Sequence, residues 1–166
     1  MQDNSITISV YETAVEYIKA GWAVIPVHGI VEDNHCTCGR YPCDRDNRTA
    51  GKHPVKGGWT SGLSMSLPDA YSAWMEDGPH WNIGIRTGNI SGFFALDVEA
   101  DGLEELAQLE ATHGSLPRTR IHGTGAGGRH YLFKMPGLDV RNNAKKLSGH
   151  IDIRGTGGMI VAPPST

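Results

Sequence analysis

Hydrophobic residues recur at helical spacing near the start of the chain and later alternate in shorter, strand-like runs. The first pattern predicts a helix over residues 10–20 that ends at Gly21, and residues 66–76 predict a second helix behind a Ser-Leu-Pro-Asp start. A third amphipathic helix is expected over residues 103–113. The shorter runs predict strands at residues 22–27, 82–87, 92–99, 120–122, 129–134, 150–154 and 159–162. This order predicts an α+β fold with helices against a mixed or antiparallel sheet.

Three acidic residues stand at exposed positions of two predicted strands. Because side chains alternate along a strand, Asp97 and Glu99 project together, away from the face of the apolar residues around them. Asp152 stands between two isoleucines and faces away from the core in the same manner. Desolvated carboxylates need a compensating cation, and two metal ions about 3.5–4 Å apart clamp both oxygens of a phosphoryl displacement. Three unrelated surface acids are the alternative, and the shared alternation favours the metal site.

A polar insertion over residues 29–58 contains every cysteine of the chain. Three cysteines so close together do not make a disulfide framework, and they fit a reducing, cytosolic setting with a metal. Zn²⁺ takes four Cys or His ligands tetrahedrally, and such a site orders a loop that lacks a core of its own. Free thiols in a loop are the alternative, and His35 is the rival for the fourth position. The predicted ligands are Cys36, Cys38, Cys43 and His53.

A glycine-rich stretch, residues 123–128, directly precedes the strand expected at residues 129–134. Its backbone N–H groups can approach a bound anion closely, as in a phosphate-binding nest, although a flexible hairpin turn is the simpler interpretation. The stretch matches neither the P-loop nor the dinucleotide fingerprint. His130 follows it and could donate to a phosphate or be structural, and Lys52 could reach a phosphate or template strand. The loop residues assigned to this contact are Thr124, Gly125, Gly127 and Gly128.

Composition and charge narrow the class of protein. A chain of 166 residues is long enough for one domain with a real core, and 22 glycines indicate many turns. The net charge of −3 argues against a strongly basic nucleic-acid binder, although basic residues concentrate in residues 118–166. No apolar run approaches the ~20 residues of a membrane span, and neither a signal peptide nor a membrane partner is expected.

Together these pieces resemble the N-terminal bifunctional primase–polymerase (Prim-Pol) domain of the archaeo-eukaryotic primase superfamily, as found in phage and plasmid replication proteins. The resemblance covers nearly the whole chain. It rests on the combination of motifs at Trp74 and at residues 20–26, 51–54, 57–59, 82–88, 91–92, 96–99, 116–119, 124–130, 151–155 and 163–165.

The resemblance implies a primase-type palm, in which an RRM-like sheet packs with a second α/β unit and residues 29–58 form a zinc-bearing insertion. Residues 1–166 would be one catalytic domain for template-directed nucleotidyl transfer, with DNA template and primer and an NTP or dNTP as partners. The nucleoside triphosphate would be bound by His130, with help from Arg86 or Arg154. The family's acidic ligands for Mg²⁺ or Mn²⁺ fall on Asp97, Glu99 and Asp152.

The family pattern usually continues beyond the Pro-Pro-Ser motif at residues 163–165. We therefore expect a fragment of a longer cytoplasmic replication protein, from a bacterial or archaeal host, with a downstream helicase domain. Two other classes stay open: a non-catalytic nucleotide- or DNA-binding zinc module, and a metal-dependent nuclease. Nucleases of the replication-initiator type need a paired-histidine motif, and the sequence contains no His-x-His.

Overall fold

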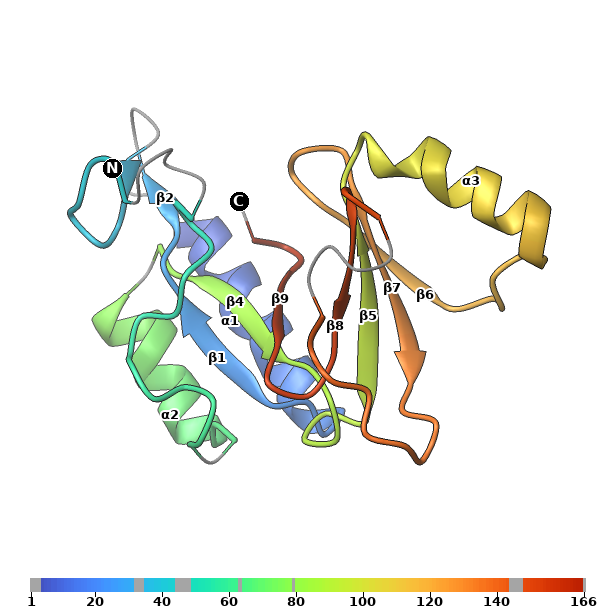
Figure 1. Cartoon of the computed structure of the whole chain (residues 1–166). Helices are drawn as coiled ribbons and strands as arrows, with labels where there is room; N and C mark the ends of the chain where they lie inside the picture. The colour runs from blue at the N-terminus through green and yellow to red at the C-terminus, as the bar shows by residue number, and fades with distance from the viewer. Residues whose placement is uncertain are drawn as a thin grey trace. The chain divides into compact units, whose positions relative to one another are not determined.

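The computed structural model describes residues 4–31, 35–43, 49–62, 64–78, 80–143 and 148–165. The chain divides into two compact units (Figure 1). The first unit comprises Met1–Arg86 with Val161–Thr166, and the second comprises Thr87–Ile160. The predicted α+β class is confirmed, and the sheet registers are antiparallel.

The first unit is built on an antiparallel strand pair that helices cover. Val24 lies opposite Ile85 and Val27 opposite Asn82, and the apolar side chains of this pair are buried. The strand order is β1-β4-β9, and only the last two residues of β9 belong to this unit. The elements are α1 (Asn4–Lys19), β1 (Val24–Val27), α2 (Leu67–Tyr71), the π-helical η2 (Ser72–Asp77), β4 (Asn82–Arg86) and β9 (Met159–Ala162).

Helix α1 buries the predicted apolar stripe, which includes Val10, Ala14 and Tyr17, but begins six residues before the predicted start. Helix α2 begins as the sequence indicates, with a capping box in which Ser66 Oγ accepts from the Asp69 N–H and the Asp69 carboxylate accepts from the Ser66 N–H. The helix then continues as the π-helix η2, a change of winding that spacing alone did not predict.

The insertion contains a small hairpin that the sequence analysis missed. Strands β2 (Ile30–Val31) and β3 (His35–Cys36) pair antiparallel, with Ile30 opposite Cys36. Two-residue strands are too short for alternation to be visible in the sequence. Gly51 packs beside this hairpin at φ +67°, and its carbonyl accepts from Asn82 Nδ2 at 3.0 Å. The insertion is therefore attached to β4 by a buried hydrogen bond.

The second unit is a four-stranded antiparallel sheet with one helix beside it (Figure 1). Leu96, Val98 and Ile151 form its core with Leu106 of the helix, so the helix covers the face on which these side chains lie. The strand order is β6-β7-β5-β8. The elements are β5 (Phe93–Val98), α3 (Gly102–His113), β6 (Arg120–Gly123), β7 (Arg129–Lys134) and β8 (Ile151–Arg154).

Strands β4 and β5 follow each other along the chain around a short turn, but they do not form a hairpin. Strand β4 belongs to the three-stranded sheet and β5 to the four-stranded sheet. The turn is closed by the Gly88 N–H, which donates to the Phe93 carbonyl at 2.7 Å. None of the helices in the described ranges is long and apolar enough to cross a membrane.

Candidate active site and zinc cluster

One row of polar side chains runs across all four strands of the second unit. Asp97 on β5 lies opposite Asp152 on β8 and, on its other side, opposite His130 on β7. His130 in turn lies opposite His122 on β6. Because residues in register project to the same face of a sheet, these four side chains share the face opposite α3. The alternation predicted this face for both aspartates, and the register brings them together.

Arg154 connects the two aspartates. Its Nη2 lies 2.9 Å from Asp97 Oδ2 and 2.8 Å from Asp152 Oδ2, and its Nε donates to Asp97 Oδ2 at 3.0 Å. Like charges directly opposite each other on neighbouring strands destabilise a sheet. The guanidinium therefore offsets a repulsion that the register itself creates, through short charge-assisted hydrogen bonds.

Asp97 has a second partner in His130, whose Nε2 lies 3.3 Å from Asp97 Oδ1. Burial raises the pKa of Asp97, but the hydrogen bond and charge of His130 and the guanidinium of Arg154 outweigh it, so the pKa lies below its usual value. Asp97 is thus an ionised carboxylate at neutral pH. His130 is buried, and its Nδ1 has no hydrogen-bond partner among the described residues.

Glu99 lies one step along the same two strands, just after the end of β5. Its backbone N–H donates to the His150 carbonyl at 3.0 Å, and its Oε2 lies 3.3 Å from His150 Nδ1. Its side chain is 65% exposed. No sequence pattern had assigned a role to His150. Its position two residues before Asp152, in the same alternation, was the signal that could have identified it.

The three carboxylates do not converge on one point. Among the described residues, three or more possible metal ligands come together in the cysteine cluster, where the ligand atoms lie within 4.8 Å of one another, and not at the carboxylates. Asp97 and Asp152 instead meet at Arg154, and Glu99 meets His150. Carboxylate oxygens are nevertheless the ligands that Mg²⁺ and Mn²⁺ prefer. The position between the two aspartates already suits a cation, so the donor set fits a divalent ion.

The glycine-rich stretch forms the hairpin turn between β6 and β7. The Thr124 N–H donates to the Gly128 carbonyl and the Gly127 N–H to the Thr124 carbonyl, both at 3.0 Å. A Cβ atom on Gly128 would lie 2.4 Å from the Val98 carbonyl oxygen and 3.2 Å from Glu99 Cα. Only glycine permits this approach, and the turn therefore packs directly against the end of β5. The part of Thr124, Gly125, Gly127 and Gly128 in phosphate binding stays a prediction.

Arg86 and Lys52, the other predicted nucleotide contacts, belong to the first unit. Arg86 is buried, and its guanidinium donates to the carbonyls of Thr60 and Gly62, the latter at 2.6 Å. Burial lowers the pKa of Arg86. These hydrogen bonds give Arg86 a role in holding residues 60–62 in place. Lys52, by contrast, is exposed. Contact of either residue with a nucleotide remains a prediction.

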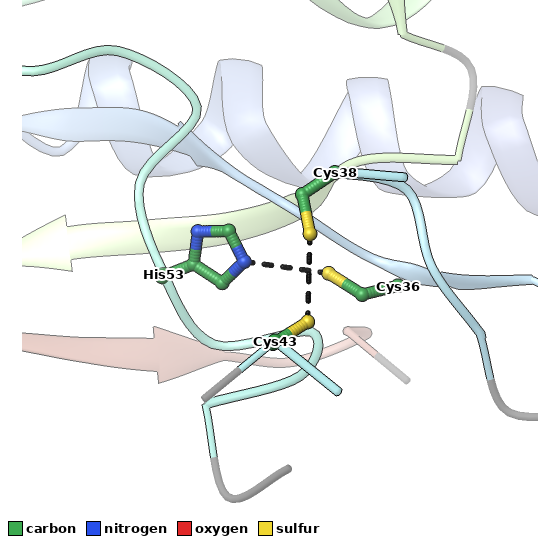
Figure 2. A group of neighbouring side chains, drawn as sticks. All are labelled: Cys36, Cys38, Cys43 and His53. Atoms are coloured by element: carbon green, nitrogen blue, oxygen red, sulfur yellow. Dashed lines mark hydrogen bonds between the residues drawn. The ribbon is translucent and has the colours of Figure 1, made fainter. Parts of the chain in front are cut away.

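The insertion brings its three cysteines and one histidine together. Figure 2 shows their side chains pointing toward a common centre, and the ligand atoms lie within 4.8 Å of one another. Cys36 Sγ lies 3.4 Å from His53 Nε2, and Cys38 Sγ lies 3.4 Å from Cys43 Sγ. His35 lies outside this group, with its ring against Tyr41 at a centroid distance of 4.9 Å. The cluster therefore favours His53 over His35 as the fourth ligand.

Backbone N–H groups support the sulfur atoms of this cluster. The Gly51 N–H donates to Cys36 Sγ at 3.5 Å and the Arg40 N–H to Cys38 Sγ at 3.4 Å. Desolvation raises the pKa of Cys38, but the Arg40 N–H and the neighbouring thiols outweigh it and lower the pKa. Desolvation, together with the neighbouring thiols of Cys38 and Cys36, raises the pKa of Cys43 to about 12. A cation among the sulfurs would let all three ionise, and Cys₃His is a structural zinc donor set.

Comparison with known proteins agrees with the resemblance described above. No curated protein matches the chain. The sequence model of the family described as "Bifunctional DNA primase/polymerase, N-terminal" matches residues 14–166. This match spans nearly the whole chain, including both the insertion with the Cys₃His cluster and the polar row on the four-stranded sheet. The chain therefore belongs to the Prim-Pol family of bifunctional DNA primase/polymerase N-terminal domains.

Proposed function

We propose that the chain catalyses template-directed transfer of a nucleotide, from an NTP or dNTP, to a 3′-hydroxyl at the row on β5 and β8. Membership of a primase/polymerase family supports a nucleotidyltransferase. The observation that carries the residue assignment is the register of Asp97 opposite Asp152, with a cation between their carboxylates. Glu99, one step along the same strands, completes the acidic set.

The proposed roles follow from the contacts. Divalent ions, Mg²⁺ or Mn²⁺, when bound at this row would supply Lewis acidity for the attacking hydroxyl and the leaving pyrophosphate. Asp97 and Asp152 would bind them as ionised carboxylates, and His130 holds the first of these carboxylates in place at 3.3 Å. His130, Arg154 and the glycine turn would bind the triphosphate, with Arg86 and Lys52 as further contacts.

The same proposal covers the rest of the chain. The four-stranded sheet and α3 would be the RRM-like part of a primase palm, and the first unit its α/β companion, within one catalytic domain. Zinc bound by the Cys₃His cluster would order residues 29–58. Phage or plasmid DNA replication, a downstream helicase domain and a cytoplasmic setting are parts of this proposal that the family suggests.

Primer extension tests the proposal. Asp97→Asn and Asp152→Asn keep the side-chain shape and remove the charge, and each is expected to abolish extension of a primed template with dNTPs and Mn²⁺. Asp139→Asn is the matched control, because Asp139 also pairs with an arginine, Arg141, but on an exposed part of the second unit. Substantial extension by Asp97→Asn with a native circular dichroism spectrum would refute the assignment.

A non-catalytic nucleotide- or DNA-binding zinc module is the second candidate. It is favoured by one observation, that Arg154 already neutralises the aspartate pair and the three carboxylates do not converge. Under this alternative the chain would bind primed template without extending it. Strand cutting in the same assay would instead indicate a nuclease.

A further inference from the structure

Arg154 occupies the position where a bound cation would touch both aspartates. A single atom, Nη2, lies within 2.9 Å of one oxygen from each carboxylate. The second nitrogen, Nε, donates to the same oxygen of Asp97 at 3.0 Å. The side chains of Asp97 and Asp152 are only 20% and 16% exposed, so these contacts lie in a partly desolvated place.

Both oxygens of Asp97 are engaged by the protein. Oδ1 lies 3.3 Å from His130 Nε2, and Oδ2 accepts from Arg154. A divalent ion that bridged Asp97 and Asp152 through their Oδ2 atoms would therefore need the place that the guanidinium holds. Two cations cannot share it, because their repulsion would be strong where water is partly excluded.

The surroundings of Arg154 allow its side chain to leave. Its cross-strand neighbour in register is Ala95, whose side chain is a single methyl group. The Arg154 side chain is 30% exposed and has the length to turn toward solvent. A guanidinium is also well suited to a phosphate, which it can bind through two parallel hydrogen bonds.

We propose that Arg154 is a displaceable counterion: it holds Asp97 and Asp152 together in the metal-free protein and withdraws when a divalent cation binds between them. The proposal rests on the proposed function, since it takes these aspartates as metal ligands. Withdrawal couples metal entry to the release of a guanidinium that can then bind the triphosphate. It also implies that the apparent affinity for a divalent ion stays low while Arg154 occupies the position between the aspartates.

Removal of Arg154 changes the metal affinity in opposite directions for a displaceable counterion and for a merely structural residue. If the guanidinium blocks the site for most of the time, the apparent metal affinity is reduced by the fraction of open sites. Removing Arg154 should then tighten metal binding, by roughly tenfold if about nine sites in ten are blocked. If Arg154 only positions the carboxylates, its removal should weaken metal binding.

The experiment is a Mn²⁺ titration of the full, zinc-loaded chain, in which electron paramagnetic resonance measures the free ion. Arg154→Gln is expected to bind Mn²⁺ about tenfold more tightly than the wild type. Arg141→Gln removes an exposed arginine–aspartate pair from the same unit and is expected to leave the Mn²⁺ affinity unchanged. Equal or weaker binding by Arg154→Gln, beside measurable binding by the wild type, overturns the proposal. Binding by neither protein overturns the metal site of the proposed function as well.

A second measurement needs no variant and so does not depend on how well Arg154→Gln folds. In the wild type, the Arg154 Nε–H resonance is followed by ¹⁵N nuclear magnetic resonance while Mg²⁺ is added. The proposal expects this resonance to move toward the position of a solvated guanidinium, with the same midpoint as the backbone amide shifts of Asp97. An Nε–H resonance that stays in place while those amides shift overturns the proposal and leaves metal binding intact.

Discussion

His122 makes the stability of the second unit depend on pH in a way that can be measured. The residue lies at the β6 end of the polar row and is 5% exposed. Burial, together with the positive charges of Arg120 and His130, lowers its pKa from 6.5 to about 4. The folded protein therefore keeps this imidazole neutral throughout the mildly acidic range.

The direction of the effect follows from proton binding. Between pH 6.5 and about 4, His122 carries a proton in the unfolded chain but not in the folded one. Acidification through this range therefore favours unfolding. The contribution is fully present above pH 6.5 and is lost as the pH falls to about 4. The gap of about 2.5 between the two pKa values corresponds to about 3 kcal/mol of unfolding free energy at 1.36 kcal/mol per pKa unit.

The assay is urea denaturation at a series of pH values for the wild type and for His122→Gln, whose side chain does not titrate. Tryptophan fluorescence is unsuitable, because all four tryptophans lie in the first unit. Amide cross-peaks of β5–β8 report the second unit directly. Between pH 7 and pH 4, the unfolding free energy of the variant is expected to fall by about 3 kcal/mol less than that of the wild type. The other groups titrate in both proteins, so only the contribution of His122 differs.

Two results would refute the reasoning. One is an equal loss of stability in the two proteins over this range, which would mean that His122 does not titrate differently on unfolding. The other is a directly measured pKa near 6.5 for the His122 ring in the folded protein, from its Cε1 proton signal. A difference in unfolding free energy that is the same at every pH is this first result, because it would reflect lost packing and no titration of His122.

Three further expectations concern other parts of the chain. Chelator-free protein should contain one zinc per chain by metal analysis, with loss in Cys38→Ser and retention in His35→Ala; well below one zinc would contradict the cluster. His130→Ala should raise the KM for nucleotide roughly tenfold to a hundredfold, whereas a lower kcat at unchanged KM would show that it acts through Asp97 instead. Arg86→Met should cost about 1–3 kcal/mol in urea denaturation followed by tryptophan fluorescence, because two carbonyls lose their donor, and unchanged stability would disprove this role.

Much of the fold followed from local patterns. Alternation along residues 93–98 placed Asp97 on the face opposite Leu96 and Val98, and the helix α3 does cover the apolar face. The capping residues Ser66 and Asp69 marked the start of α2 correctly. These features depend on neighbours within a few residues, and such short-range preferences are visible in a sequence.

The partners of the site residues could not be predicted in this way. The pairing of Asp97 with Asp152 and with His130 depends on the register of three strands, which tertiary packing sets. His122 was missed because a lone histidine in a four-residue strand gives no pattern. The hairpin of β2 and β3 was missed because neither strand exceeds two residues. The Cys₃His cluster was found because spacing and residue type identify such ligands without any register.

The Cys₃His cluster and the pair of Asp97 and Asp152 differ in how the charges of neighbouring ionisable groups are compensated. In the insertion, four ligand atoms converge within 4.8 Å, and the opposite pKa shifts of Cys38 and Cys43 show that the thiols compete for ionisation. A resident cation would let these thiols ionise together, which suits a structural metal. On β5 and β8 the chain supplies its own cation, Arg154, so the aspartates are satisfied without a metal. Under the proposed function, such a site would be able to exchange its ions each time a product is released.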